Sequence, residues 1–97
     1  MVYTEGVICS EPKVNLQYGD AEFYISKDGK GMNADGTGDP ANTIKVYQNY
    51  YLNKDKYTDA NKDLIKKGQK VVICGKLLLY NCVTPEINSG NYIVSIK

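Results

Sequence analysis

Two stretches in the first half of the chain alternate apolar and polar residues with the period of two that is typical of β-strands. In residues 21–26 the apolar set is Ala21, Phe23 and Ile25. In residues 43–51 the apolar set is Ile44 and Val46. We expect each strand to turn this set toward the core. The residues between them should then face outward, and they include Tyr24, Lys45, Tyr47, Asn49 and Tyr51.

The β-branched run Val71-Val72-Ile73 predicts a further strand, which resumes as an apolar run over residues 77–80. Gly75 interrupts it, and an isolated glycine in a strand indicates a bulge or a sharp bend. Before this strand, Thr58 or Asp59 can cap a short helix that runs to about Lys67, and Gly68 suits the position after its end. The apolar positions of that helix, Tyr57, Leu64 and Ile65, should lie on one face.

A strand at residues 2–9, which resumes at 14–17 after a break at Pro12, and a strand at 91–97 complete the pattern, with a short extended piece at 85–87. The order is three strands, a short helix and two strands. This predicts an all-β chain, a five-stranded OB-fold Greek-key barrel with one short helix between strands 3 and 4, as a single domain over residues 1–97. An SH3-like barrel is the rival and accounts less well for residues 57–67. The expected interior is Phe23, Ile25, Ile44, Val46, Val71, Ile73 and Leu77.

The composition argues against several kinds of activity. The formal net charge is +1, and the basic side chains are all lysine, so the bidentate fork that reads guanine edges and phosphates is missing. The chain also has no histidine, the commonest general base and a leading metal ligand. We therefore expect no enzyme activity, no metal and no cofactor. The lysines Lys62, Lys66 and Lys67 lie at helical spacing from Asp59 and Asp63, which indicates a solvated, partly paired face.

The three cysteines, Cys9, Cys74 and Cys82, show no CxxC or other zinc-binding spacing. We expect free thiols, with Cys82 the most reactive because it falls in a turn. A single disulfide with one thiol left over is the alternative. The first and fourth strands are neighbours in an OB barrel, so Cys9 and Cys74 should come close.

A glycine- and asparagine-rich loop over residues 30–42 is long by the usual measure. Its aspartates invite a calcium reading, but Gly31 occupies the first ligand position of the EF-hand template and Asn42 replaces the glutamate at the twelfth. No apolar run approaches the ~18 residues of a membrane span, and we expect no signal peptide within these residues ahead of Val2.

Several of these motifs resemble OB-fold domains of exported bacterial proteins and lipoproteins, notably of gut Bacteroidetes, which are described as nucleic-acid-binding-like. The matching runs are Gly19–Ser26, Val46–Tyr47 with Tyr51–Leu52, Gly68–Leu77 with Tyr80, and Thr84–Ile87. The resemblance covers roughly residues 7–96 and implies an OB barrel in an exported or cell-surface protein. The loop over residues 30–42 is longer than this family would have.

The expected binding face consists of Tyr24, Lys45, Tyr47, Asn49 and Tyr51 on the second and third strands. This is the face on which OB-folds bind oligonucleotides or oligosaccharides, and tyrosines there can stack on bases while lysines neutralise phosphates. With a net charge of +1, binding of single-stranded nucleic acid should be weak. The alternative is a structural or protein–protein module, with the tyrosines covered by a neighbouring domain or a second copy.

Overall fold

The computed structural model describes residues 2–33, 35–80, 84–88 and 90–97, and it confirms the all-β class. These residues form three short 3-10 helices, η1 (Pro40–Asn42), η2 (Leu52–Lys54) and η3 (Lys62–Leu64). They also form eight strands: β1 (Val2–Ile8), β2 (Lys13–Asn15), β3 (Asp20–Ser26), β4 (Ile44–Asn49), β5 (Lys70–Gly75), β6 (Leu77–Tyr80), β7 (Thr84–Ile87) and β8 (Tyr92–Ile96).

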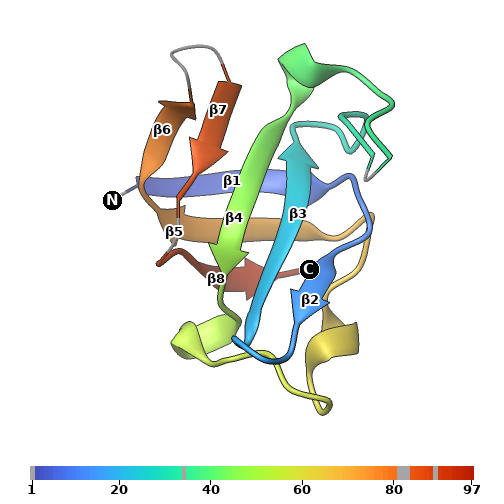
Figure 1. Cartoon of the computed structure of the whole chain (residues 1–97). Helices are drawn as coiled ribbons and strands as arrows, with labels where there is room; N and C mark the ends of the chain where they lie inside the picture. The colour runs from blue at the N-terminus through green and yellow to red at the C-terminus, as the bar shows by residue number, and fades with distance from the viewer. Residues whose placement is uncertain (1, 34, 81–83, 89) are drawn as a thin grey trace.

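The eight strands belong to one open sheet in the order β6-β7-β4-β3-β1-β5-β8, and β2 also pairs with β3, on the side away from β4. Neighbouring strands are antiparallel, except that β4 and β7 are parallel. The sheet folds over on itself, so that β3 and β4 run across β1, β5 and β8 (Figure 1). Beyond the end of β4, Tyr50 makes an isolated parallel bridge to Tyr92 of β8, through two backbone hydrogen bonds of 3.0 Å.

The prediction of five strands in a closed barrel is therefore wrong. The residues after Pro12 form a strand of their own, which pairs with the first half of β3. The residues after Gly75 do not continue β5: Leu77–Tyr80 and Thr84–Ile87 form a hairpin that is added to the sheet beside β4. A sequence pattern gives the position of a strand but not the strand with which it pairs, so these additions were not visible in it.

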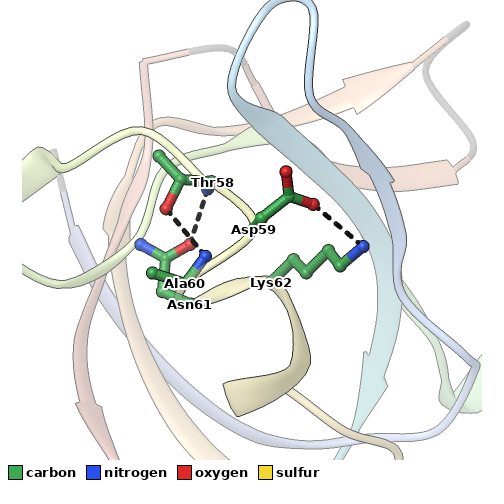
Figure 2. Close-up of polar contacts among 5 residues, drawn as sticks. All are labelled: Thr58, Asp59, Ala60, Asn61 and Lys62. Atoms are coloured by element: carbon green, nitrogen blue, oxygen red, sulfur yellow. Dashed lines mark hydrogen bonds and ion pairs between the residues drawn. The ribbon is translucent and has the colours of Figure 1, made fainter.

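The helix predicted to run from Thr58 or Asp59 to about Lys67 is not formed: the described residues contain no α-helix, and only the 3-10 helix η3 lies in this segment. The predicted cap at Thr58 is present (Figure 2), since the Thr58 backbone N–H donates to Asn61 Oδ1 at 2.7 Å and the Ala60 N–H donates to Thr58 Oγ1 at 3.2 Å. These are the reciprocal bonds of a helix N-terminus, but only the single turn of η3 follows them. Tyr57 and Ile65 are buried as expected, whereas Leu64 is exposed. None of the helices in the described ranges is long and apolar enough to cross a membrane.

The core confirms the register expected for β3, because Phe23 is buried and Tyr24 is only half-buried. Five of the seven predicted interior residues are buried, namely Phe23, Ile25, Val46, Val71 and Ile73. Ile44 packs against this core from its edge. Leu77 is 45% exposed, contrary to the prediction. Ser26 was expected to face outward but is buried, and its Oγ accepts a hydrogen bond from the Gly31 N–H.

Gly75 marks the bend that the sequence predicted, since β5 ends there and the chain turns into β6 (Figure 1). The backbone of Gly75 lies close against two neighbours. A Cβ atom added there would be 2.5 Å from Asn91 Cβ and 2.7 Å from Ile87 Cγ2. Glycine is required at this position because β5 must pass close to the chain just before β8.

Candidate functional site

Three of the five predicted face residues come together on the outer side of β3 and β4. Tyr24 lies directly opposite Lys45 in the β3–β4 ladder. The Lys45 ammonium lies 5.5 Å from the centre of the Tyr47 ring. Asn49 and Tyr51 do not belong to this surface: Asn49 is fully buried, and Tyr51 packs against the core with its ring 5.6 Å from that of Tyr57.

A β-bulge in β4 separates the residues that face outward from Asn49 and Tyr51. Phe23 pairs with Val46, but Ala21 pairs with Asn49, so Tyr47 and Gln48 of β4 together face the single residue Glu22 of β3. Two residues opposite one is the definition of a bulge, and it reverses the direction of every side chain that follows. Gln48 makes the turn with a φ of 49°, which is unusual for a residue other than glycine. The prediction that Asn49 faces outward is wrong for this reason.

Asn49 instead belongs to a buried polar cluster with Tyr57 and Asn91, the Asn49–Tyr57–Asn91 cluster. The Tyr57 hydroxyl donates to Asn49 Oδ1 at 2.6 Å, and Asn49 Nδ2 donates to Asn91 Oδ1 at 2.7 Å. Asn91 Nδ2 donates to the backbone carbonyls of Tyr47 and Asn88. Burial raises the pKa of Tyr57 far above its ordinary value, and the neighbouring Tyr51 acts in the same direction. The cluster joins β4 to the start of β8.

The outer face carries a row of alternating charge that crosses four strands. Lys13 of β2 lies opposite Glu22 of β3. Glu22 Oε1 forms an ion pair of 3.2 Å with Lys45 Nζ of β4. Lys45 is in register with Glu86 of β7. The row contains two lysines and two glutamates and is neutral as a whole. Lys13, Glu22 and Glu86 were not among the predicted site residues, because only the strand pairing brings them to Lys45.

The charge state of Lys45 is fixed by this row. Burial alone would lower its pKa, but the hydrogen bond and charge of Glu22, together with Tyr24 and Glu86, outweigh the burial and leave the pKa raised. The ammonium is therefore cationic at neutral pH. Its charge is directed at a carboxylate of its own sheet rather than at solvent, which weakens its attraction for phosphate.

The same face is hollowed along the length of β3. A cleft of about 550 Å³ lies between Tyr24, Lys45, Pro85 and the loop residues Met32 and Pro40. A second hollow, of about 350 Å³, lies at the other end, between Tyr18 and Tyr47. A small hollow lined by Tyr24, Lys45, Lys13 and Glu22 shares residues with both. We call these three neighbouring hollows the outer groove. Both ends present tyrosine rings, and the neutral charge row crosses its middle.

The loop over residues 27–43 forms one rim of the outer groove and keeps its own carboxylates occupied. Asp28 Oδ1 accepts hydrogen bonds from the Lys30 N–H and from Asn42 Nδ2, and Asp39 Oδ1 accepts one from the Ala41 N–H. These bonds hold the pKa of Asp28 below its ordinary value, with the Lys30 N–H as the main cause. In the part of the chain that the structure describes, no group of three or more His, Cys, Asp or Glu side chains is placed to hold a metal ion.

The lysines near residues 62–70 are partly paired. Lys62 Nζ lies 3.1 Å from Asp59 Oδ1, three residues earlier (Figure 2). Lys67 Nζ donates to Asn33 Oδ1 at 3.0 Å, and Lys70 Nζ lies 2.6 Å from Glu5 Oε1. The hydrogen bond and charge of Lys70 hold the pKa of Glu5 below its ordinary value. Of the predicted lysine–aspartate pairs, only Lys62 with Asp59 is present among the described residues, and Lys66 and Lys67 are exposed as expected of a solvated face. Such exposed pairs add little stability.

Cys9 and Cys74 are free thiols and both are buried, as expected of unpaired cysteines. They are not close together, because Cys74 pairs with Tyr3 at one end of the β1–β5 ladder and Cys9 follows the other end. Cys82 lies outside the described residues. Burial raises the pKa of the Cys9 thiol above its ordinary value of 9.0, and hydrogen bonds involving Ser26 and Gly31 oppose this only in part.

Native-state labelling tests the thiols. At mildly alkaline pH we expect Cys9 and Cys74 to react with a thiol reagent only on unfolding, because both are buried and the thiolate of Cys9 is disfavoured. Mass spectrometry of labelled peptides measures the labelling of each thiol. Because the pKa of Cys9 is raised in the folded state, the stability that Cys9 contributes is complete below pH 9.0 and is lost as the pH rises through the folded pKa. Rapid labelling of Cys9 in the native protein would contradict the burial.

The chain matches no family model, no curated protein and no solved structure.

Proposed function

We propose that this chain is a non-catalytic binding module that holds an extended, uncharged polymer, of the class of oligosaccharides, in the outer groove. The observation that carries the proposal is the combination in one hollow surface of tyrosine rings at both ends and a neutral row of charged side chains between them.

The tyrosines supply the flat surfaces. Tyr18 is 61% exposed and Tyr47 is 37% exposed, so both rings are open to a ligand at one end of the groove. Tyr24 lines the cleft at the other end. Aromatic rings with a polar tip provide large contact area at a small entropic cost. The strand between the two ends is long enough for several sugar units in a row.

The charge row favours an uncharged ligand over nucleic acid. Glu22 and Glu86 offer hydrogen-bond acceptors for hydroxyl groups, and Lys13 and Lys45 offer donors. A polyanion would gain little, because lysines that already face carboxylates neutralise few phosphates and so release few counterions into solution. Single-stranded nucleic acid, the ligand class expected for the tyrosine and lysine face, therefore remains the second candidate, with weak affinity.

We further propose that β1, β3, β4, β5 and β8 correspond to the five strands of an OB-fold, with β2 and the β6–β7 hairpin as additions. The pairing of β1 with both β3 and β5, of β3 with β4, and of β5 with β8 supports this. The parallel bridge between Tyr50 and Tyr92 supports it as well, because it relates the third and last strands of the five. In that arrangement the outer groove follows the face that OB-folds use for ligands.

The test is calorimetric titration with two ligand sets, neutral linear oligosaccharides and single-stranded oligonucleotides. We expect binding of an oligosaccharide with little dependence on salt. Tyr24→Ala should weaken this binding at least about tenfold, the size of one lost stacking contact. Tyr3→Ala is the matched control, since Tyr3 is 72% exposed but lies on β1, away from the groove.

Each outcome separates the alternatives. Binding only to oligonucleotides, with affinity that falls steeply as salt rises, would replace the oligosaccharide by nucleic acid. A loss with Tyr3→Ala as large as with Tyr24→Ala would remove the groove from the proposal. No binding of either set would leave the structural or protein–protein module as the function and overturn the proposal.

A further inference from the structure

The strand β6 forms an end of the sheet and has an unusual composition for that position. One edge of β6 pairs with β7, and no strand among the described residues pairs with its other edge. Residues 77–80 include no charged residue and no proline. Leu77, Leu78 and Leu79 are 45%, 40% and 62% exposed, so leucines stand uncovered on both faces. Edge strands of monomeric proteins usually carry a charge, a proline or a bulge that prevents further pairing.

At the opposite end of the sheet, the edge of β8 has a backbone partner. The edge of β8 is engaged by the backbone of Tyr50, which accepts from the Ile93 N–H and donates to the carbonyl of Asn91. That contact occupies the start of the β8 edge, at residues 91–93. Strand β6 has no such contact in the described ranges.

The hydrogen bonds of the β6–β7 hairpin determine what β6 presents at its open edge. The Asn88 N–H donates to the carbonyl of Lys76 at 3.0 Å, which makes Lys76 and Asn88 a hydrogen-bonded pair. Bonded and non-bonded pairs alternate along an antiparallel ladder. The next pair, Leu77 with Ile87, is therefore non-bonded, and so is Leu79 with Pro85.

Pro85 agrees with this assignment, because proline has no N–H to donate and the pair of Leu79 with Pro85 is a non-bonded pair. The N–H and carbonyl groups of Leu77 and Leu79 must then point away from β7, toward the open edge. They form two donor–acceptor sets placed symmetrically on either side of Leu78.

We propose that β6 pairs antiparallel with β6 of a second copy of this chain, about a twofold axis at Leu78. A twofold axis perpendicular to the sheet keeps the same face of both copies on the same side, so Leu78 meets Leu78 of the copy. Leu77 of each chain then lies opposite Leu79 of the other. These are the two residues whose backbone groups are free, so the register forms two hydrogen-bonded pairs, with four N–H···O bonds in total.

The leucine side chains of β6 are compatible with the same twofold axis. On one face the two Leu78 side chains meet, and on the other each Leu77 meets Leu79 of the copy, so all three exposed leucines gain an apolar neighbour. The pairing brings no like charges together, since residues 77–79 carry none. A foreign strand could pair with the edge but would not reproduce this self-complementary arrangement. The two sheets join into one continuous sheet.

Sedimentation equilibrium on the full chain, from micromolar to millimolar concentration, tests the pairing. We expect the mass to rise from 10.8 kDa toward twice that value. Leu79→Lys should raise the dissociation constant of the dimer at least tenfold, because it puts a charge at the edge, while its circular dichroism stays that of the parent. Val94→Lys is the matched control, an exposed apolar residue of β8 whose replacement should leave the dimer unchanged.

Amide hydrogen exchange gives a readout that does not depend on a variant. The amides of Leu77 and Leu79 should exchange more slowly as the concentration rises, whereas the amide of Leu78, which bonds to β7 within one chain, should not change. A monomer mass at every concentration would overturn the proposal. A dimer that Leu79→Lys leaves equally tight, or in which Leu77 and Leu79 exchange independently of concentration, would overturn it as well.

Discussion

Replacement of Asn49 by leucine should lower the free energy of unfolding by about 2–6 kcal/mol, since it leaves two buried polar groups without partners at roughly 1–3 kcal/mol each. The Tyr57 hydroxyl would lose its acceptor and Asn91 Oδ1 its donor. All three residues of the cluster are almost fully buried, so water cannot replace the lost bonds. Urea unfolding followed by circular dichroism measures the effect. A change below about 0.5 kcal/mol, as expected of an exposed site, would contradict it.

A double-mutant cycle shows whether the cluster acts as a unit. Tyr57→Phe alone should cost about 1–3 kcal/mol, because Asn49 Oδ1 then has no donor. Combined with Asn49→Leu, it should cost less than the sum, because the phenylalanine brings no hydroxyl that needs an acceptor. Tyr18→Phe is the control, since that tyrosine is largely exposed and should change stability little. Strict additivity in the cycle would show that the two side chains act independently.

Gly75→Ala should be the second severe change, at about 3 kcal/mol, the upper part of the range for added atoms in a packed interior. The new Cβ would overlap Asn91 Cβ at 2.5 Å and Ile87 Cγ2 at 2.7 Å, and both neighbours are buried. The start of β8 must therefore shift, and with it Asn91 of the cluster. The same urea titration measures the loss, and amide chemical shifts in β7 and β8 should move together.

Gly68→Ala separates crowding from backbone conformation. Gly68 has a φ of 95°, but nothing lies within 4 Å of an added Cβ. Its replacement strains the backbone without crowding a neighbour, and should cost about 1 kcal/mol with only local changes in chemical shift. An equal loss for the two variants would mean that the close approach at Gly75 does not limit stability.

The comparison of β3 with β4 shows what a sequence pattern can predict. In β3 the alternation continues through Phe23, Tyr24 and Ile25, and the predicted faces are correct. In β4 the same reasoning fails after Tyr47, because the bulge at Tyr47 and Gln48 depends on β3 and on the cluster that draws Asn49 inward. One signal was present: strict alternation would have put the polar Gln48 in the core beside Val46.

The candidate site was likewise predicted only in part from the sequence. Tyr24, Lys45 and Tyr47 lie close together along two neighbouring strands, and their shared face was predicted. Lys13 and Glu86 join them only because β2 pairs with β3 and β7 pairs with β4. Those pairings connect residues far apart in the chain, and no local periodicity specifies them. Leu77 was placed in the core for a related reason, since an apolar run after Gly75 does not reveal that the chain has left β5 for a new hairpin.

The pairing of β1 with β5 also sets when this chain can fold during its synthesis. Val7 lies opposite Lys70 and Val2 lies opposite Gly75, so the first strand has no partner on that side until residues 70–75 have emerged from the ribosome. Bringing such distant segments together loses chain entropy before any contact compensates for it, and folds of this kind form in milliseconds to seconds. We expect β1 to wait, extended and unpaired on that edge, and its docking on β5 to limit the rate of folding.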